Sequence, residues 1–169
     1  MRILVFSHYF WPEDFRINDL LQELSLKGHS IEVITGKPNY PEGNIFEDFK
    51  DAPENFQNYE NIKITRLNIL PRGNNLVTQF LNYLSYVYKT SIFVVTNYKK
   101  INLDLIFVYM PSPITVCIPA ILLKFLVRKP MIYWVLDLWP ETLRAIGLIT
   151  WKINLFLLSK IINFFYNRA

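Results

Sequence analysis

Short apolar runs alternate along the chain with longer stretches in which hydrophobic residues recur at a helical period. Residues 2–6 form the first run and are rich in side chains typical of strands. Apolar residues between positions 17 and 24 then follow the i, i+3, i+4, i+7 spacing of an amphipathic helix, and Gly28 comes where helices commonly end. A second strand is predicted over 30–35. This order indicates a β-α-β unit, because parallel strands need a crossover.

The alternation continues to the end of the chain. Residues 36–61 are predicted to form a long loop, since proline, glycine and polar residues interrupt them. We predict further strands over 62–67, 104–109 and 131–136, and helices over 75–99 and 113–128. The last of these strands is mostly apolar, so we expect it at the centre of the sheet. The pattern predicts an α/β fold with a doubly wound, Rossmann-like parallel sheet.

We predict a Rossmann-like domain over 1–149, followed by an amphipathic helix over 150–169 that leads towards an absent second domain. On a helical wheel the apolar arc of this helix exceeds half the circumference, which is wider than a surface helix needs. Lysines interrupt it too often for a bilayer span of about 20 apolar residues. Two interpretations remain: the helix packs against a missing partner, or it lies in a membrane interface. We expect the chain to be a truncated form of a longer protein.

Charge is distributed unevenly within a chain whose net charge is +4. Residues 1–61 carry five Lys and Arg against eleven Asp and Glu, whereas residues 62–169 carry thirteen against three. A basic half rich in aromatic side chains fits anionic lipid or nucleic acid, although lysines also decorate ordinary solvated surfaces. The accompanying aromatic residues favour the membrane surface, and we expect no nucleic-acid partner.

Several classes of protein are disfavoured by what the chain contains. Cys117 is the single cysteine, so no disulfide can form within the chain, and His8 and His29 lie too far apart for a zinc pattern. No glycine occurs between residues 1 and 27, where a dinucleotide fingerprint would need several. The start lacks an apolar leader, so a cytoplasmic location is predicted. We expect neither metal nor cofactor.

Candidate chemistry lies in the loops that follow the strands, where doubly wound sheets bind ligands. Asp137 and Glu141 lie in one turn and are two of only three carboxylates among residues 62–169. Either can accept a hydrogen bond from a sugar hydroxyl or a substrate proton, or can cap the following helix. His8 follows the first strand, where a functional and a structural role are equally expected. Arg16 can orient an anionic group, or pair with neighbouring carboxylates.

Two other loops contribute candidates. Ser112 and the free N–H groups at the start of the next helix can bind a phosphate or a hydroxyl, or Ser112 can be a simple N-cap. Residues 39–43 form a turn-rich tip, and Lys37 and Tyr40 are candidates for closing over a substrate.

Three stretches resemble the amino-terminal domain of family 4 glycosyltransferases of the GT-B fold. They are Ser-His-Tyr-Phe-Trp-Pro-Glu with Arg-Ile-Asn-Asp-Leu (within 3–24), Gly-His leading to Val-Ile-Thr-Gly-Lys-Pro-Asn-Tyr-Pro (28–41), and Asp-Leu-Trp-Pro-Glu (137–141). The likeness covers nearly the whole chain and is nearest to the bacterial surface-polysaccharide branch that includes N-acetyl-fucosamine transferases. The first and third stretches are specific, whereas a bare Gly-His before a strand is not.

The resemblance implies a retaining, metal-independent transferase with two Rossmann-like domains facing each other across a cleft. The amino-terminal domain, here residues 1–149, supplies the acceptor site, and the second domain holds most contacts to the nucleotide-sugar donor. The implied acceptor is a polyprenyl-diphosphate-linked sugar at the inner membrane face, used to build polysaccharides such as O-antigen or capsule. We therefore expect a peripheral membrane protein that, lacking a second GT-B domain, does not complete transfer alone.

The resemblance also assigns roles to individual residues. Asp137 is expected to contact the reacting sugars, with Glu141 near the transfer centre. His8 and Arg16 are expected to position acceptor or donor phosphate, with Trp11 and Glu13 on the same cleft-bordering loop. Asp137 and His8 are thus the predicted catalytic residues, and the others bind substrate. The alternative is a non-catalytic, membrane-associated binding module; an unrelated enzyme such as an epimerase is disfavoured by the missing glycine fingerprint.

Overall fold

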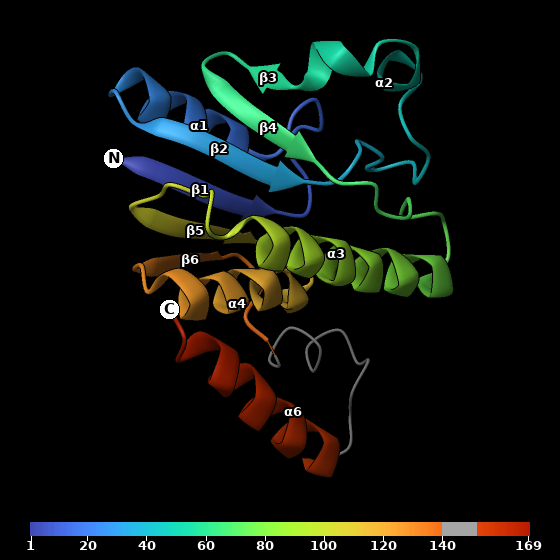
Figure 1. Ribbon diagram of the computed structural model, residues 1–169. Helices are drawn as coiled ribbons and strands as arrows, with labels where there is room; N and C mark the ends of the chain where they lie inside the picture. The colour runs from blue at the N-terminus through green and yellow to red at the C-terminus, as the bar shows by residue number, and fades with distance from the viewer. Residues whose placement is uncertain (140–151) are drawn as a thin grey trace.

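The computed structural model describes residues 1–139 and 152–169, apart from the side chains of 152–157 (Figure 1). Strands alternate with helices along most of the chain, as the hydrophobic pattern predicts. The described elements are β1 (Arg2–Ser7), α1 (Arg16–Leu26), β2 (Ser30–Thr35), α2 (Glu47–Asp51), the 3-10 helix η1 (Pro53–Phe56), β3 (Asn58–Tyr59), β4 (Ile62–Arg66), α3 (Leu76–Asn97), β5 (Leu105–Met110), the 3-10 helix η2 (Ile114–Val116), α4 (Cys117–Val127), β6 (Met131–Val135) and α6 (Lys152–Tyr166).

Six strands form one sheet in the order β3-β4-β2-β1-β5-β6, and every pair except β3 with β4 is parallel. From β1 the chain builds outwards through β2 and β4, then returns to the other side of β1 through β5 and β6. The direction of winding therefore reverses between β1 and β5, which is the switch point of a doubly wound sheet. The α/β, Rossmann-like fold predicted from the sequence is confirmed.

The predicted central position of the last strand is wrong. In the described part of the chain, β6 pairs only with β5, from Ile106 opposite Met131 to Met110 opposite Val135. Its apolar residues are explained by helices instead: Tyr133 and Val135 pack against the core under α4 and α6, while Ile132 is exposed. An apolar run indicates that the side chains of a strand are buried, but it does not indicate whether the strand has neighbours on one side or on both.

The prediction that residues 36–61 lack regular structure is also wrong. This segment contains α2, η1 and β3, which are too short to give a periodic signal. They are held by tertiary contacts, because Phe49 is buried and its ring lies 5.6 Å from the ring of Phe56. β3 forms by pairing antiparallel with β4, a partner that local sequence does not reveal.

Alternate side chains of the central strands enter two different cores. Ile3 and Val5 of β1 pack on the α1 side, and Leu4 and Phe6 pack on the side of α3 and α4. Figure 1 shows α3 and α4 in front of the sheet and α1 behind it. Ile162 of α6 is buried in the α3–α4 core. The predicted domain boundary between residues 149 and 150 lies outside the described residues.

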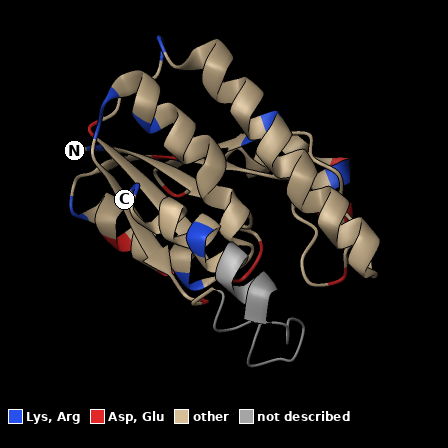
Figure 2. Cartoon of the chain, turned by 90° about the horizontal axis from the view of Figure 1, so that it is seen from below, with Lys and Arg blue, Asp and Glu red and all other residues tan. Residues whose placement is uncertain are grey.

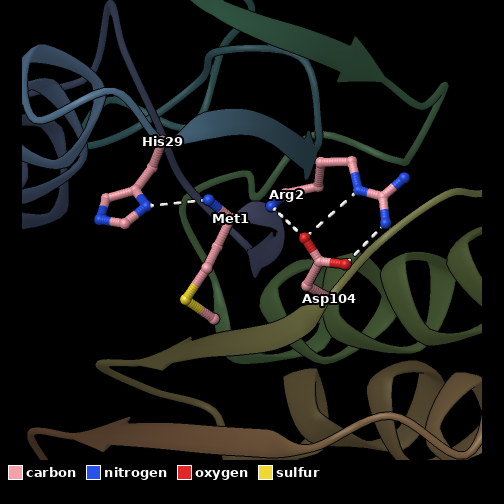
Figure 3. Close-up of polar contacts among 4 residues, drawn as sticks. All are labelled: Met1, Arg2, His29 and Asp104. Carbon is pink, nitrogen blue, oxygen red and sulfur yellow. Dashed lines mark hydrogen bonds and ion pairs between the residues drawn. The ribbon is translucent and has the colours of Figure 1, made fainter.

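The amino edge of the sheet is fastened by polar contacts of the first two residues (Figure 3). The Arg2 guanidinium forms an ion pair with Asp104 at 2.6 Å, and the Arg2 backbone N–H donates to the same carboxylate at 2.8 Å. The amino group of Met1 lies 3.3 Å from Nδ1 of His29. These contacts join β1 to the turns before β5 and β2, at the edge opposite the candidate site.

Candidate functional site

The candidate site lies at the carboxyl edge of the sheet, where the parallel strands β1, β2, β5 and β6 end. Ser7 is in register with Tyr109, and Met110 is in register with Val135. His8 and Asp137, which follow β1 and β6, therefore belong to the same edge. This is the juxtaposition that the predicted site required, and it is where ligands bind in open α/β sheets.

A cavity of about 310 Å³ opens among the loops at this edge. Six separate segments contribute to its wall, from the β1 loop to the β6 loop, so most of its lining comes from residues distant in sequence. It unites three predicted site residues, Tyr40, Ser112 and Asp137, with five that sequence reasoning did not select. The lining consists of Tyr9, Phe15, Tyr40, Arg72, Tyr83, Pro111, Ser112 and Asp137.

Aromatic rings form one side of this cavity. The Tyr9 and Phe15 rings stack nearly parallel with centroids 5.4 Å apart, and Tyr40 lies 5.1 Å from each. The Arg72 guanidinium carbon lies 5.3 Å from the centre of the Tyr40 ring. Such an aromatic floor with a cation above it offers apolar faces together with directed N–H donors.

Arg72 is held by its backbone as well as by its side chain. Its N–H donates to Oδ1 of Asn39 at 2.8 Å, and the buried Asn39 amide also donates to the Lys37 carbonyl at 2.7 Å. The segment before α3 is thereby tied to the loop after β2. The only sequence signal for Arg72 is a basic residue in the turn-forming stretch 71–75, which is too common a pattern to select it.

His8 is buried behind this aromatic wall. Its Nε2 lies 2.7 Å from Oδ1 of Asn82, whose amide nitrogen donates to the Leu70 carbonyl at 2.6 Å. Because that amide is oriented by Leu70, Nε2 of His8 must be the protonated nitrogen. Burial, with a smaller effect from the positive charge of Arg72, lowers the pKa of His8 to about 4. The imidazole is therefore neutral at physiological pH, and its ring contacts the Tyr9 and Tyr83 rings rather than the cavity itself.

Glu13 joins two of the loops that shape the site. One carboxylate oxygen accepts the backbone N–H groups of Asn39 and Tyr40, both at 2.8 Å, and the other accepts the Phe10 N–H at 3.2 Å. Burial raises the pKa of Glu13 to about 7, against the opposing effect of these three hydrogen bonds. Its oxygens thus position the loop that carries Tyr40, and its predicted contact with substrate stays a prediction.

Trp11 is placed by a residue that the sequence did not single out. Arg66, at the end of β4, donates to the backbone carbonyls of Trp11 and Gly36, the latter at 3.0 Å. The Trp11 ring lies 5.2 Å from Tyr59 and 5.3 Å from Phe56, on the side of the sheet that α1 covers. Trp11 therefore packs against the segment after α2 and is not among the residues that line the cavity.

The other predicted site residues either lie away from the cavity or lie outside the described residues. Arg16 is exposed at the first position of α1, and within the described residues it forms no ion pair with Glu13 or with its neighbours. Lys37 is half-buried and does not line the cavity. The capping interpretation of Ser112 is wrong, because Pro113 holds the N-cap position of η2. Glu141 lies outside the described residues, as does any helix that Asp137 could cap.

The described residues contain neither a cluster of metal ligands nor an accessible thiol. Among residues 1–139 and 152–169, no three His, Cys, Asp or Glu side chains come close enough to hold a metal ion. Cys117 is fully buried in α4, and burial raises the pKa of its thiol to about 12. That thiol is therefore protonated and shielded, as expected for a structural cysteine.

A larger hollow of about 470 Å³ lies at the opposite, amino edge, beside Arg2, Lys63 and Lys100. It does not face the strand ends at which doubly wound sheets bind ligands. Comparison of the chain with protein-family models and with curated proteins finds no match. The carboxyl-edge cavity lies at those strand ends and is the candidate functional site.

Proposed function

We propose that this chain is the acceptor-binding half of a retaining glycosyltransferase, which moves a sugar from a nucleotide-sugar to a lipid-linked glycan in polysaccharide biosynthesis. The observation that carries the proposal is the meeting of Asp137 with Ser112 and three tyrosines in one cavity at the carboxyl edge. Carboxylate and hydroxyl oxygens accept hydrogen bonds from sugar hydroxyls, and aromatic walls provide the apolar lining common in ligand sites. The motif resemblance to family 4 glycosyltransferases supports the same assignment.

In this proposal Asp137 orients the reacting sugar hydroxyl, and the chain completes transfer only with a donor-binding domain facing the same edge. His8 is a positioning residue, because its buried ring supports Tyr9 and Tyr83 at centroid distances of 4.6 and 5.5 Å. Glu13 and Arg66 fix the loops that carry the aromatic wall. The contribution of this half is then mainly the placement of the acceptor and stabilisation of charge.

The association with lipid is proposed from the unusual burial pattern of α3. The helix buries Asn82, Tyr86, Thr90 and Val94 towards the sheet, and presents apolar side chains outwards. Leu76 and Phe80 are 79% and 59% exposed, whereas an ordinary amphipathic helix presents polar side chains to solvent. The exposed apolar face of α3 comprises Leu76, Val77, Phe80, Leu81, Leu84, Tyr88, Ile92 and Val95.

Charge around this face favours an anionic bilayer. Residues 61–103 contain six Lys and Arg and no Asp or Glu, and Figure 2 shows the long helix α3 almost entirely tan, with no red on it. No helix among the described residues is long and apolar enough to cross a bilayer. We propose that α3 lies in the headgroup region of the inner membrane face, with its apolar face inserted. Figure 1 shows its first turns projecting beyond the ends of the central strands, and Tyr83 of the same helix lines the cavity.

The transfer proposal is tested by reconstitution. The chain, joined to the donor-binding domain of a family 4 transferase, is assayed for sugar transfer from nucleotide-sugars to a polyprenyl-diphosphate-linked sugar. Transfer by the wild type and its loss in Asp137→Asn are the expected results. The matched control is Asp51→Asn, an exposed carboxylate at the end of α2, which should leave the rate unchanged. Full activity of Asp137→Asn removes this residue from the proposed site.

The lipid proposal is tested by flotation with vesicles of phosphatidylglycerol or phosphatidylcholine. The wild type should float with the anionic vesicles, and part of the binding should survive high salt because apolar insertion is not screened. Phe80→Ser should weaken binding, whereas Phe125→Ser, which removes a ring of 58% exposure from α4, should not. Equal loss in both variants contradicts the assignment to α3. Lipid binding without transfer in the reconstituted protein favours the alternative, a non-catalytic membrane-associated binding module.

A further inference from the structure

We propose that the carboxyl-edge cavity is a sugar-phosphate site in which Arg72 and Tyr9 hold the phosphate and Asp137 and Ser112 hold the sugar. The inference rests on the proposed function, since it identifies the part of the acceptor or donor that this half recognises. It also assigns the phosphate to different residues from those that the sequence suggested, because His8 lies behind the cavity wall and Arg16 is not among the lining residues.

The Arg72 side chain is positioned by contacts within the protein itself. Its backbone is tied to Asn39, its guanidinium lies over the Tyr40 ring, and it forms no ion pair within the described part of the chain. A guanidinium presents five N–H donors in a planar fork that matches two oxygens of a phosphate. Because the side chain is already ordered by these contacts, less conformational entropy is lost when an anion binds.

Tyr9 supplies a second, independent indication of a ligand. The side chain lines the cavity and is only 4% exposed, yet its buried hydroxyl has no hydrogen-bond partner among the described residues. Buried hydroxyls are nearly always paired, so an orphan at a cavity wall points to a partner that arrives with the ligand. Burial raises the pKa of Tyr9, and Tyr83 adds to this effect while the positive charge of Arg72 opposes it. The phenol therefore stays protonated and can donate to an anion beside the guanidinium.

Asp137 excludes a simple anion as the ligand. A carboxylate on the same cavity repels phosphate, but it accepts hydrogen bonds from neutral hydroxyls. The ligand must therefore carry an anionic group for Arg72 and hydroxyl groups for Asp137 and Ser112. A hexose with a phosphate on its anomeric carbon meets both requirements, and about 310 Å³ is at the small end of the roughly 300–1,000 Å³ typical of ligand pockets.

Isothermal titration of the folded chain with α-glucose 1-phosphate, methyl α-glucoside and inorganic phosphate tests this site. The sugar phosphate should bind at least about tenfold more tightly than either part alone, as expected for two charge-assisted contacts. Arg72→Gln should remove that advantage, Arg72→Lys should keep part of it, and Tyr9→Phe should weaken binding about threefold to tenfold. Arg128→Gln, at the other end of the sheet, is the matched control and should change nothing.

The source of the sugar phosphate is distinguished by two further probes. A farnesyl-diphosphate-linked sugar that binds more tightly than UDP-glucose identifies the lipid-linked acceptor, and the reverse order identifies the donor. Urea midpoints of all variants establish that they are folded before binding is compared.

Equal affinities of Arg72→Gln and wild type for glucose 1-phosphate overturn the phosphate site. If methyl glucoside still binds through Asp137 in that case, the proposed function survives. If Arg72-dependent binding is seen but Asp137→Asn binds glucose 1-phosphate as well as the wild type does, the phosphate site stands and the sugar contact of the proposed function falls.

Discussion

Acidification should destabilise this protein through His8, and the effect can be calculated from its burial. The folded protein holds the pKa of His8 at about 4, whereas the ordinary value is 6.5. Between these values the unfolded chain binds a proton that the folded protein excludes. The contribution of His8 to the free energy of unfolding is therefore fully present above about pH 6.5 and is lost as the pH falls towards about 4. The full loss amounts to about 3 kcal/mol, since one pKa unit corresponds to about 1.4 kcal/mol.

The measurement must separate His8 from Glu13, which acts in the opposite direction. The pKa of Glu13 is raised from 4.5 to about 7, so its contribution to stability is present below about pH 4.5 and is lost as the pH rises through about 7. Urea unfolding of wild type and His8→Gln at several values between about pH 4 and pH 7.5 cancels the Glu13 effect, because both proteins contain it. Glutamine keeps an N–H donor for Asn82 and does not titrate.

The difference in unfolding free energy between the two proteins should fall by about 3 kcal/mol between about pH 7 and pH 4. Proton NMR gives a second reading, since the chain has only two histidines and His29→Gln identifies the remaining signal as His8. A pH-independent difference in stability, together with a His8 resonance that titrates near pH 6.5, would refute the reasoning from burial.

Three further predictions concern the stability of the fold and the shielding of Cys117. Gly43→Ala should cost about 2 kcal/mol of unfolding free energy, because φ is +81° and a Cβ would lie 2.5 Å from the Gly73 carbonyl oxygen; an unchanged urea midpoint contradicts this. Arg66→Gln should lower the free energy of unfolding by roughly 2–3 kcal/mol, since the guanidinium donates to backbone carbonyls of two loops, at Trp11 and Gly36, and of η1, at Phe56; Arg66→Lys should recover only part of this loss in thermal unfolding. Cys117 should resist a chromogenic thiol reagent in native buffer and react after unfolding in guanidinium; rapid labelling of the native protein would show that α4 opens.

The carboxyl-edge site was only partly accessible from the sequence. Loops after parallel strands share one edge, so His8 and Asp137 could be assigned to the same side of the molecule before any coordinates. Local sequence could not indicate that His8 turns inwards towards Asn82, which is 74 positions away. It also could not identify Arg72 and Tyr9 as neighbours, because their approach depends on how the segment before α3 meets the loop after β2.

The sequence by itself determined the main helices, the principal strands and the class of sheet, which is parallel and doubly wound, because hydrophobic periodicity records which face of each element is buried. Tertiary structure alone decided the edge position of β6, the short elements between β2 and β4, and the exposure of an apolar face of α3. Those features depend on contacts between distant segments, and such contacts leave no periodic trace in either partner. The cavity belongs to the second group, because five loops and the helix α3 form its wall, and no single one of these segments contains the cation, the carboxylate and the aromatic rings together.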